Sequence, residues 1–422
     1  MVALSEGRLV RDLLSNGFLD ELVESDREVV LITPADRVPC FAAEWQRPGV
    51  QLEHLYEFDD SRTNLARSMR VRKRLARYGW RSMLRIWLRL EREYMFRPRK
   101  EYLDLLKEKQ PALVVSTNAT TTRESQVISS AKSLGIKTLG VVGSWDRLHK
   151  FMYTRADHIS VWNDINRQEA VELEGFQKRF VHVTGPAQFD PYFDPESELP
   201  KEDFCASMGL DPNRPILMLA TAGSFVQGYD ESYMLDWLME QIYGGAIPNR
   251  PQVICRLHPF SRIEQFLSWA DHPDVRLSYI KGYIPTLGYT MTREEVVQVS
   301  NMLRHSDVVI TPGSTMTIEA AIFDTPVIVP VFHLYQNEMC ERYYRTRVFG
   351  RHFARIKQRN LVPIVYGPTE TLQAINRCIA EPEWMSDQRK ELVADYCHVT
   401  DGQSTKRLAD LALRLASNGT SQ

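Results

Sequence analysis

The segment from His305 to Phe332 has the sequence HSDVVITPGSTMTIEAAIFDTPVIVPVF, and its pattern decides the fold class. The β-branched run from Asp307 to Thr311 predicts a parallel strand that is buried on both faces, and Pro312-Gly313 ends this strand. A helix to about Phe323 and a second apolar strand from Val327 to Val331 are predicted to follow. A strand, a turn, a helix and a strand in this order indicate an α/β fold with a parallel sheet.

The turn in this segment has the features of an anion-binding site. Ser314 or Thr315 can cap the helix, whose first backbone N–H groups and positive dipole end lie where Gly313 lets a ligand approach closely. We therefore predict that a phosphate binds here. We also predict that Glu319, one turn further along, accepts hydrogen bonds from the vicinal hydroxyls of a ribose. The alternative is that the hydroxyl side chains only cap the helix and that Glu319 only complements its dipole.

Length and composition are those of an ordinary globular protein. The 422 residues are too many for one core and indicate two α/β domains. A hydrophobic content of 43%, a charged content of 25% and a net charge of −2 give no indication of nucleic-acid binding. Six cysteines without a CxxC pair suggest neither a zinc site nor a disulfide framework and fit a reducing cytoplasm. No segment has the pattern of a signal peptide or a membrane span, so we predict a cytoplasmic protein.

Residues 62–100 are the exception to this composition. They contain fourteen Lys or Arg against only Glu91 and Glu93, and apolar residues, including Trp80 and Trp87, recur mostly three or four positions apart. This spacing predicts a basic amphipathic helix or helix pair. One possibility is that this surface contacts anionic lipid on the inner face of the cell membrane or an acidic acceptor. The alternative is that the helix packs on the core and leaves its cationic face in water.

Polar residues follow the predicted strands of the first half of the chain. Apolar spacing predicts a helix over residues 7–23, and strands of the buried type are expected at 112–116 and 138–142. Open α/β sheets bind ligands at the carboxyl ends of their strands. The residues that follow these two strands and that we predict to contact an acceptor are Asn118, Ser144 and Trp145. Trp145 is expected to stack on a sugar face.

Three strand-end loops of the second half are predicted to lie side by side. They are Gly223-Ser224 after the strand 216–220, Arg256 to Pro259 after the strand 252–256, and Gly313 to Thr315. Together they form a predicted pocket for a nucleoside diphosphate. In this pocket His258, held by the rigid Pro259, donates to a phosphate oxygen, and Arg256 adds positive charge. A structural histidine is the alternative role for His258.

Other nucleotide-binding signatures do not fit the sequence. Gly223 and Gly228 have the spacing of a Walker loop, but Tyr229 and Asp230 stand where Lys and Ser or Thr are required. No GxGxxG follows a strand, and no Asp-x-Asp occurs that would chelate a metal-bound diphosphate. Neutralisation would then fall to the helix dipole and to cationic side chains, so we expect neither a metal ion nor a cofactor.

The order of several short motifs resembles one group of enzymes. RLHP at 256–259, the PGST turn with Glu319 and the TPVIVP that follows, and DGQSTKR at 401–407 resemble glycosyltransferases of the GT-B fold. Within that fold the chain is most similar to bacterial surface-polysaccharide enzymes, among them HP-motif sialyl- and Kdo-type transferases and CDP-glycerol transferases. The resemblance implies two Rossmann-like α/β/α domains whose parallel sheets face each other across a cleft.

The resemblance also implies roles for single residues. In those enzymes the histidine of the HP motif contacts the donor phosphate, which corresponds to His258. Ser314 and Thr315 would hold phosphate and Glu319 would bind the ribose. Asp324 departs from the pattern because it replaces the glycine that usually ends the donor helix, and this puts the geometry of that turn in question.

The predicted domain limits follow from these elements. An acceptor-binding domain at 1–193 carries 62–100 as a helical insert, and 194–215, rich in Pro, Asp and Glu, is a linker region. A nucleotide-sugar-binding domain covers 216–385. The helices expected at 386–422 are predicted to pack back on the N-terminal domain.

These observations together predict a metal-independent GT-B glycosyltransferase. It would move a sugar from a nucleotide-activated donor to a glycan or lipid-linked acceptor during surface-polysaccharide synthesis. Asp146 is the candidate general base, and its alternative role is a turn or helix cap. Three other functions stay open: a CDP-polyol phosphotransferase with the same pocket, a nucleotide-sugar 2-epimerase, and a non-catalytic nucleotide-sugar-binding subunit.

Overall fold

A computed structural model describes most of the chain. The described residues are 1–57, 68, 70–72, 74, 75, 78–80, 82–84, 86–88, 90, 97–148, 152, 154–223, 230, 232–334 and 350–417. The chain divides into two compact units. Unit 1 consists of Met1–Asp190, Gly282–Thr290 and Cys397–Gln422, and unit 2 consists of Pro191–Lys281 and Met291–Tyr396.

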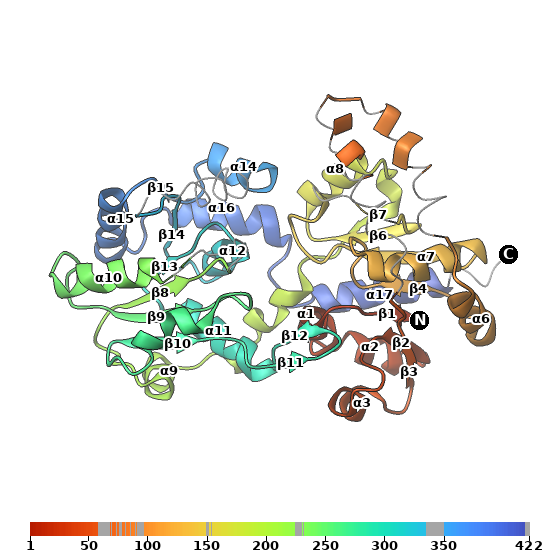
Figure 1. The fold of residues 1–422 in the computed structure, drawn as a ribbon, viewed down its shortest axis with the longest axis horizontal. Coiled ribbons are helices and arrows are strands. Elements are labelled where there is room, and N and C mark those ends of the chain that lie inside the picture. The colour runs from red at the N-terminus through yellow and green to blue at the C-terminus, as the bar shows by residue number, and fades with distance from the viewer. Residues whose placement is uncertain are drawn as a thin grey trace. The chain divides into compact units, whose positions relative to one another are not determined.

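Unit 1 is built on a seven-stranded sheet with the order β3-β2-β1-β4-β5-β6-β7 (Figure 1). Each pair of neighbouring strands is parallel, which agrees with the prediction made from their apolar, buried-type sequences. The strands are β1 (Val2–Ala3), β2 (Val29–Thr33), β3 (Val50–His54), β4 (Val114–Ser116), β5 (Thr138–Val141), β6 (His158–Val161) and β7 (Val181–Val183). The two-residue β1 is an interior strand of the sheet, between β2 and β4.

The two faces of this sheet carry separate cores. Neighbouring residues of a strand point to opposite faces, so Val2 packs in one hydrophobic cluster and Ala3 in another. The first cluster holds side chains from α1 (Gly7–Leu9), η1 (Val10–Leu14), α2 (Phe18–Glu24), α3 (Pro39–Trp45) and α17 (Ser404–Ser417). The second cluster holds side chains from α6 (Lys100–Lys109) and α7 (Thr122–Ser133). A third cluster, which includes Ala170, lies under α8 (Asp164–Leu173).

The helix predicted over residues 7–23 is interrupted. After α1, the segment η1 forms a π-helical turn in which the Ser15 N–H donates to the Val10 carbonyl oxygen at 2.8 Å. Gly17 then adopts a left-handed conformation with φ 85°, and α2 begins at Phe18. The apolar spacing placed the buried face correctly. A left-handed glycine and the extra residue of a π turn break the helix without changing that face.

Unit 2 is built on a six-stranded sheet with the order β10-β9-β8-β13-β14-β15, again parallel throughout. The strands are β8 (Ile216–Ala220), β9 (Gln252–Arg256), β10 (Val275–Ser278), β13 (Val308–Ile310), β14 (Val327–Pro330) and β15 (Ile364–Val365). The helices are α9 (Lys201–Met208), α10 (Tyr233–Tyr243), α11 (Arg293–His305), α12 (Thr315–Ile322), α14 (Arg351–Gln358), α15 (Pro368–Ala380) and α16 (Ser386–Cys397). Of the short 3-10 turns, η3 (Lys178–Phe180) belongs to unit 1, η4 (Ala187–Phe193) runs across the limit between the two units, and η5 (Pro195–Ser197) and η6 (Ile263–Trp269) belong to unit 2.

The segment expected to be a linker packs within unit 2. Residues 194–215 belong to that unit, and Asp194 forms an ion pair with Arg293 of α11 at 2.6 Å. The side chain of Asn301, also on α11, accepts from the Leu199 N–H at 2.9 Å and donates to the Ser197 carbonyl oxygen at 2.8 Å. The segment 194–215 thus contains η5 and α9, and α11 holds the irregular backbone before α9 in place.

A hairpin from the second half of the sequence belongs to unit 1. It consists of β11 (Tyr283–Ile284) and β12 (Gly288–Tyr289), and Ile284 and Leu287 pack in the same hydrophobic cluster as Leu9. The Leu287 carbonyl oxygen accepts from the Gly7 N–H at 2.8 Å. At the other end of the chain, α16 lies in unit 2 up to Tyr396, whereas α17 contacts α2 in unit 1.

The segment that decides the fold has the predicted order β13, α12, β14, with each boundary within two residues of its prediction. Asp324, which stands in place of the expected glycine after α12, adopts the left-handed conformation with φ 53°. Its carboxylate accepts from Ser386 Oγ at 2.6 Å and from Arg389 Nε at 2.7 Å. The turn therefore keeps the geometry that glycine would give, and the aspartate adds an anchor to α16.

We expect the Asp324→Ala variant to be less stable by about 1–3 kcal/mol, because the half-exposed carboxylate partners a nearly buried Arg389 and because alanine disfavours the left-handed conformation. Asp324→Gly is the matched variant, since it relieves the backbone but also loses the ion pair. Urea unfolding followed by circular dichroism measures both. A glycine variant more stable than the parent would mean that relief of the left-handed backbone outweighs the ion pair.

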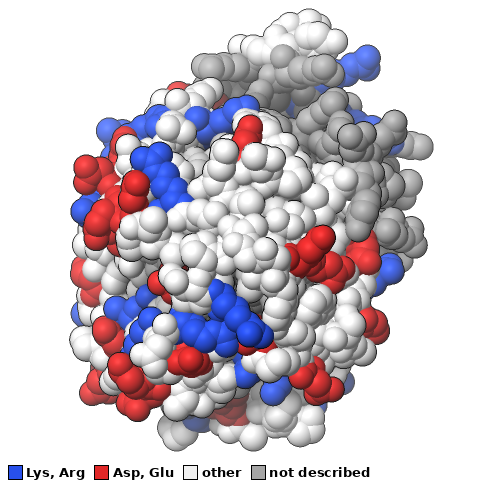
Figure 2. Space-filling model, turned by 90° about the vertical axis from the view of Figure 1, so that its left-hand side faces the viewer, with Lys and Arg blue, Asp and Glu red and all other residues white. Residues whose placement is uncertain are grey.

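The surface of unit 2 beside α10 and α15 carries charges of both signs. Figure 2 shows Lys and Arg side chains next to Asp and Glu side chains there, around a broad uncharged area. Within the described part of the chain, no helix has the length and apolarity needed to cross a membrane.

Candidate functional site

Three strand-end loops of unit 2 lie at one edge of its sheet. Strands β9, β8 and β13 are neighbours and parallel, so the loops that follow them emerge side by side, as predicted. Gly223, after β8, has φ 83° and lies against the imidazole of His258, after β9. A Cβ atom at Gly223 would come within 2.5 Å of His258 Nδ1. A glycine is needed there for both reasons, whereas Ser224 lies outside the described residues.

The backbone around His258 fixes the tautomer of its ring. The His258 N–H donates to Thr221 Oγ1 at 2.8 Å, and the Phe260 N–H donates to His258 Nδ1 at 3.2 Å. Since Nδ1 accepts, the proton of the neutral ring resides on Nε2. His258 is half-buried and is followed by Pro259. The ring thus has the protonation needed to donate from Nε2, which is the predicted contact to a phosphate oxygen.

Arg256 is buried beside this loop. It is the last residue of β9 and is 8% exposed, and its Nη1 donates to Ser278 Oγ at 2.9 Å. Its Nη2 lies 3.8 Å from the sulfur of Met291. The guanidinium therefore supplies a buried positive charge next to the His258 loop, while its direct contact with a ligand stays a prediction.

The amino end of α12 is capped by Ser314. Its Oγ accepts from the Met316 N–H at 3.2 Å and lies 3.0 Å from Thr311 Oγ1, so Ser314 is the cap and Thr315 is the first helical residue. Gly313, buried and with φ 74°, forms the turn before it. The cap uses one of the first N–H groups of the helix, and the positive dipole end remains next to the glycine.

Glu319 has a partner that the sequence did not indicate. The hydroxyl of Tyr192 donates to Glu319 Oε2 at 2.7 Å, and the Tyr192 ring packs on Phe323 with ring centroids 5.5 Å apart. Tyr192 comes from η4, and a sequence separation of 127 from Glu319 hides the pair from any local pattern. The tyrosine orients one carboxylate oxygen. A carboxylate accepts several hydrogen bonds, so a ribose diol can still bind to it.

If Glu319 binds the ribose, the Glu319→Gln variant should lose more affinity for ribonucleotides than for their 2′-deoxy analogues, by about tenfold. Isothermal titration with matched ribo- and deoxyribonucleotides measures the difference. Tyr192→Phe is the control, because it removes the orienting hydroxyl and leaves the carboxylate in place. Equal losses for both nucleotide series would assign Glu319 to helix capping or to the Tyr192 contact alone.

The predicted acceptor residues of unit 1 have structural surroundings. Asn118 is 1% exposed, and its side chain donates to Glu6 and accepts from Thr120. Trp145 is 4% exposed, so its ring faces are not available for sugar stacking, and the predicted stacking does not fit the structure. Ser144 Oγ donates to Asp146 Oδ1 at 2.8 Å, and both residues are half-buried. Asp146 and Ser144 thus stay candidates, whereas the Asn118 side chain is already hydrogen-bonded to Glu6 and Thr120 and the Trp145 ring is buried.

Glu124, which the sequence did not single out, explains the burial of Asn118. Its carboxylate is fully buried and accepts from Ser5 Oγ at 2.6 Å, Ser116 Oγ at 2.7 Å and the Asn118 N–H at 3.0 Å. Burial raises the pKa of Glu124, and these three donors offset part of that shift. The loop after β4 is therefore fixed to the loop after β1 by one buried carboxylate.

The parallel-sheet units place the chain in the GT-B fold class. Residues 122–414 match the family of CDP-glycerol:poly(glycerophosphate) glycerophosphotransferases, and the chain belongs to this family of transferases. A sequence search of curated proteins finds no match.

Solved structures with a similar fold include nucleotide-sugar enzymes. A putative UDP-N-acetylglucosamine 2-epimerase from Listeria monocytogenes is 12% identical, with a TM-score of 0.61 over 100% of this chain and 97% of that one. The UDP-GlcNAc 2-epimerase from Neisseria meningitidis, bound to UDP-GlcNAc, is 11% identical, with a TM-score of 0.59 over 98% and 99%. The S. aureus MnaA–UDP structure is 12% identical, with a TM-score of 0.59 over 100% and 97%. At these identities the likeness concerns the fold alone.

Proposed function

We propose that this protein transfers a polyol phosphate from a CDP-linked polyol to a hydroxyl group of a growing cell-surface polymer. Family membership over residues 122–414 carries this proposal, because that range contains every predicted nucleotide-binding residue from Gly223 to Glu319. The arrangement of His258, Gly223 and the α12 terminus at one sheet edge supports it. Both a pyrophosphate and a ribose have suitable partners there.

The proposed reaction is a substitution at phosphorus. The acceptor hydroxyl gives its proton to a base, for which Asp146 is the candidate, and its oxygen forms a bond to the β-phosphorus of the donor. The bond between that phosphorus and the bridging oxygen breaks, and CMP leaves with the electron pair. The Nε2–H of His258 and the amino end of α12 stabilise the negative charge on the departing phosphate.

Glycosyl transfer, the function predicted from the sequence, is the second candidate. It would use the same nucleotide pocket, but the acceptor oxygen would attack the anomeric carbon of the sugar. The bond between that carbon and the phosphate oxygen would break, and the phosphate would stay on the nucleotide. The RLHP motif around His258 and its resemblance to HP-motif glycosyltransferases favour this candidate.

The position of phosphorus in the product separates the two candidates. The protein is incubated with CDP-glycerol, or with a panel of UDP-, GDP-, dTDP- and CMP-sugars, and an acceptor fraction from a cell envelope. Phosphorus NMR of the polymer reports a new phosphodiester and release of CMP in the first case, and no new phosphodiester in the second. Thermal shifts with the free nucleotides report binding. Absence of both turnover and nucleotide binding would overturn either form of the proposal.

We also expect transfer to continue in EDTA. The sequence has no Asp-x-Asp, and the amino end of α12 with His258 provides the charge stabilisation that a metal would supply. The measurement is the initial rate with and without EDTA, followed by addition of magnesium or manganese. Loss of the rate in EDTA and its recovery with either ion would contradict this.

We further propose that the basic segment attaches the protein peripherally to an anionic membrane. Several large apolar side chains in it are exposed: Trp80 at 54%, Met83 at 53%, Ile86 at 61% and Leu90 at 45%. Exposed apolar residues within a cationic sequence match the requirements of an interfacial surface. A lipid-linked acceptor would be presented at such a surface.

A further inference from the structure

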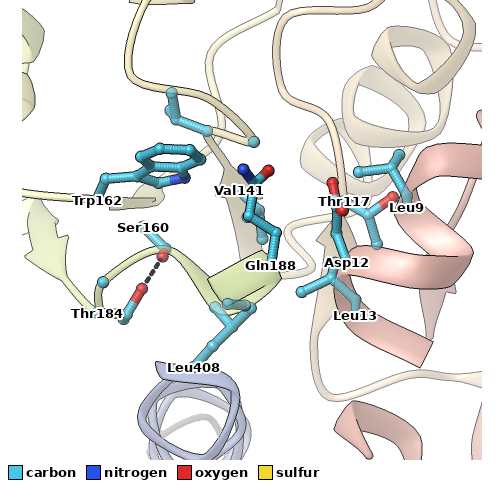
Figure 3. Close-up of a pocket in the computed structure, with 14 residues that line it drawn as sticks. Leu9, Asp12, Leu13, Thr117, Val141, Ser160, Trp162, Thr184, Gln188 and Leu408 are labelled. Carbon is cyan, nitrogen blue, oxygen red and sulfur yellow. Dashed lines mark hydrogen bonds between the residues drawn. The ribbon is translucent and has the colours of Figure 1, made fainter. Parts of the chain in front are cut away.

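The carboxyl edge of the unit 1 sheet differs along its length. The ends of β4 to β7 line one small cavity (Figure 3), where Ser160 Oγ and Thr184 Oγ1 form a hydrogen bond of 2.7 Å. The volume of this cavity is about 20 Å³, which is room for about one water molecule and for no acceptor unit. The ends of β2 and β3 instead carry a partly exposed histidine and its carboxylate partner.

His54 and Asp36 form a dyad at this part of the edge. His54 is the last residue of β3, and Asp36 lies in the loop that follows the neighbouring strand β2. His54 Nδ1 lies 2.6 Å from Asp36 Oδ1, and Arg37 Nε lies 3.5 Å from the other carboxylate oxygen. The side chains of His54 and Asp36 are 34% and 12% exposed, so the ring reaches solvent while its partner is largely covered. The Tyr56 ring packs edge-on against the imidazole, with centroids 4.9 Å apart, and fixes it from a second side.

The carboxylate fixes the tautomer of His54. A carboxylate only accepts hydrogen bonds at neutral pH, so Nδ1 carries the proton and the neutral ring has its lone pair on Nε2. No residue in the described part of the chain forms a hydrogen bond with this nitrogen. His258 has the opposite tautomer, because its Nδ1 accepts and its Nε2 carries the proton. The tautomer of His258 therefore suits donation to a phosphate, and that of His54 suits acceptance of a proton.

The dyad lies at the base of the basic segment 62–100. This segment follows β3 in the chain, and its last residue, Lys100, begins α6. Tyr102 Oη accepts from the Tyr56 N–H at 2.9 Å and donates to the Tyr56 carbonyl oxygen at 3.2 Å. The chain entering the segment and the chain leaving it are thus joined beside His54. A lipid-linked acceptor held by the basic segment would reach the sheet at this point.

We propose that His54 is the general base that deprotonates the acceptor hydroxyl, and that Asp36 positions it. The hydroxyl proton passes to His54 Nε2, and the acceptor oxygen uses the freed electron pair to form its bond to the phosphorus of the donor. The bond from that phosphorus to the bridging oxygen breaks, and its electron pair leaves with CMP. The imidazolium that forms is stabilised by the adjacent Asp36 carboxylate. The inference rests on the proposed function, since it names the base for that transfer.

His54 and Asp146, the candidate base chosen from the sequence, cannot act on the same hydroxyl. Asp146 follows β5, and β2, β1 and β4 lie between β3 and β5, so the two strand ends are about 19 Å apart. One oxygen of Asp146 also accepts from Ser144 Oγ already. General bases act best when their pKa is near the working pH, which favours imidazole over a carboxylate in general.

The transfer assay with variants of the full chain tests the assignment. His54→Gln should lower kcat by about 10²- to 10⁴-fold, which is the usual contribution of a general base, and should leave the nucleotide thermal shift unchanged. Asp36→Asn should lower kcat by about tenfold or more, because an amide does not enforce the tautomer. In His54→Gly, added imidazole should restore part of the rate. His158→Gln is the matched control and should keep the parental kcat, since His158 is half-buried at the amino end of β6, on the opposite edge of the same sheet.

The outcomes separate this inference from the proposed function. A large loss in His54→Gln with rescue of His54→Gly by imidazole supports the base. An unchanged kcat in His54→Gln overturns it and leaves the function intact. A loss that imidazole does not restore, together with a lower melting temperature, also overturns it and makes the dyad a structural tie between β2 and β3. An equal loss in His158→Gln overturns it because the effect is not local. A parent without transfer from any donor overturns the function and the base together.

Discussion

Replacing His258 with alanine is expected to lower kcat by about 10²- to 10³-fold, because the variant loses a donor to the departing phosphate. Because Nδ1 accepts from the Phe260 N–H, the proton of the neutral ring is on Nε2, the atom to which the proposal assigns this donation. Nucleotide affinity should fall as well. Stability should change little, because the half-buried ring lies against Gly223 rather than within a hydrophobic cluster. Steady-state kinetics and the melting temperature measure the two effects.

A second histidine of unit 2 provides the matched control. His272 Nδ1 accepts from the Asp274 N–H at 3.2 Å, which is the same local contact, two residues along, that His258 makes with Phe260. His272→Ala therefore removes an equivalent turn interaction away from the three strand-end loops. Equal activity losses in the two variants would show that His258 acts only through its turn. A loss confined to His258 would assign the effect to its position at the nucleotide pocket.

The most accurate predictions were those for strands whose own residues are apolar enough to indicate burial. The strand Ile216–Ala220 is a continuous apolar run and Gln252–Arg256 has an apolar centre, and the structure has both with the predicted ends. A parallel strand buried on both faces needs such a run whatever surrounds it. The adjacency of the loops after β8, β9 and β13 followed from the same property, since parallel strands have their carboxyl ends at one edge.

Side-chain roles in unit 1 were predictable only in part, because they depend on partners distant in the sequence. Asn118 and Trp145 follow strands and are polar or aromatic, which is the pattern of ligand-binding residues. Glu124 and the neighbouring loops bury Asn118. The hairpin 282–290 was also missed, since two-residue strands carry too little pattern and Leu287 packs on a cluster formed mostly by the first residues of the chain. Tertiary contacts decide such cases.

The second large effect is expected for membrane attachment. The described residues 82–84, 86–88 and 90 are helical, and their side chains divide into two faces. Leu84 and Leu88 are buried, with exposed fractions of 6% and 2%, and Trp87 donates to Ser68 Oγ at 2.9 Å. This face of the helix therefore already contacts other parts of the protein. Met83, Ile86 and Leu90, spaced three and four apart, are exposed instead. The predicted interfacial role therefore passes from Trp87 to the exposed face with Trp80.

The triple variant Trp80→Ser, Met83→Ser, Ile86→Ser should lower partitioning onto vesicles of phosphatidylglycerol and phosphatidylcholine by about 100-fold. Each exposed side chain that enters the interface is worth roughly 1 kcal/mol, and about 1.4 kcal/mol corresponds to tenfold. Partitioning of the parent should also fall as salt rises, because the fourteen basic residues of 62–100 act through screened charges. Co-sedimentation over a salt series measures both.

A control triple in unit 2 separates membrane insertion from a general loss of apolar surface. Tyr243, Leu267 and Tyr366 are exposed at 48%, 55% and 52%, close to the values of the first set, but lie outside the basic segment. Their serine variants should partition like the parent. Trp87→Ala should instead lower the melting temperature and leave vesicle binding of the folded protein unchanged, since its ring belongs to the face that contacts other parts of the protein. Equal losses in both triples, or a parent that stays in the supernatant at low salt, would exclude the membrane role and leave the segment as a solvated basic surface.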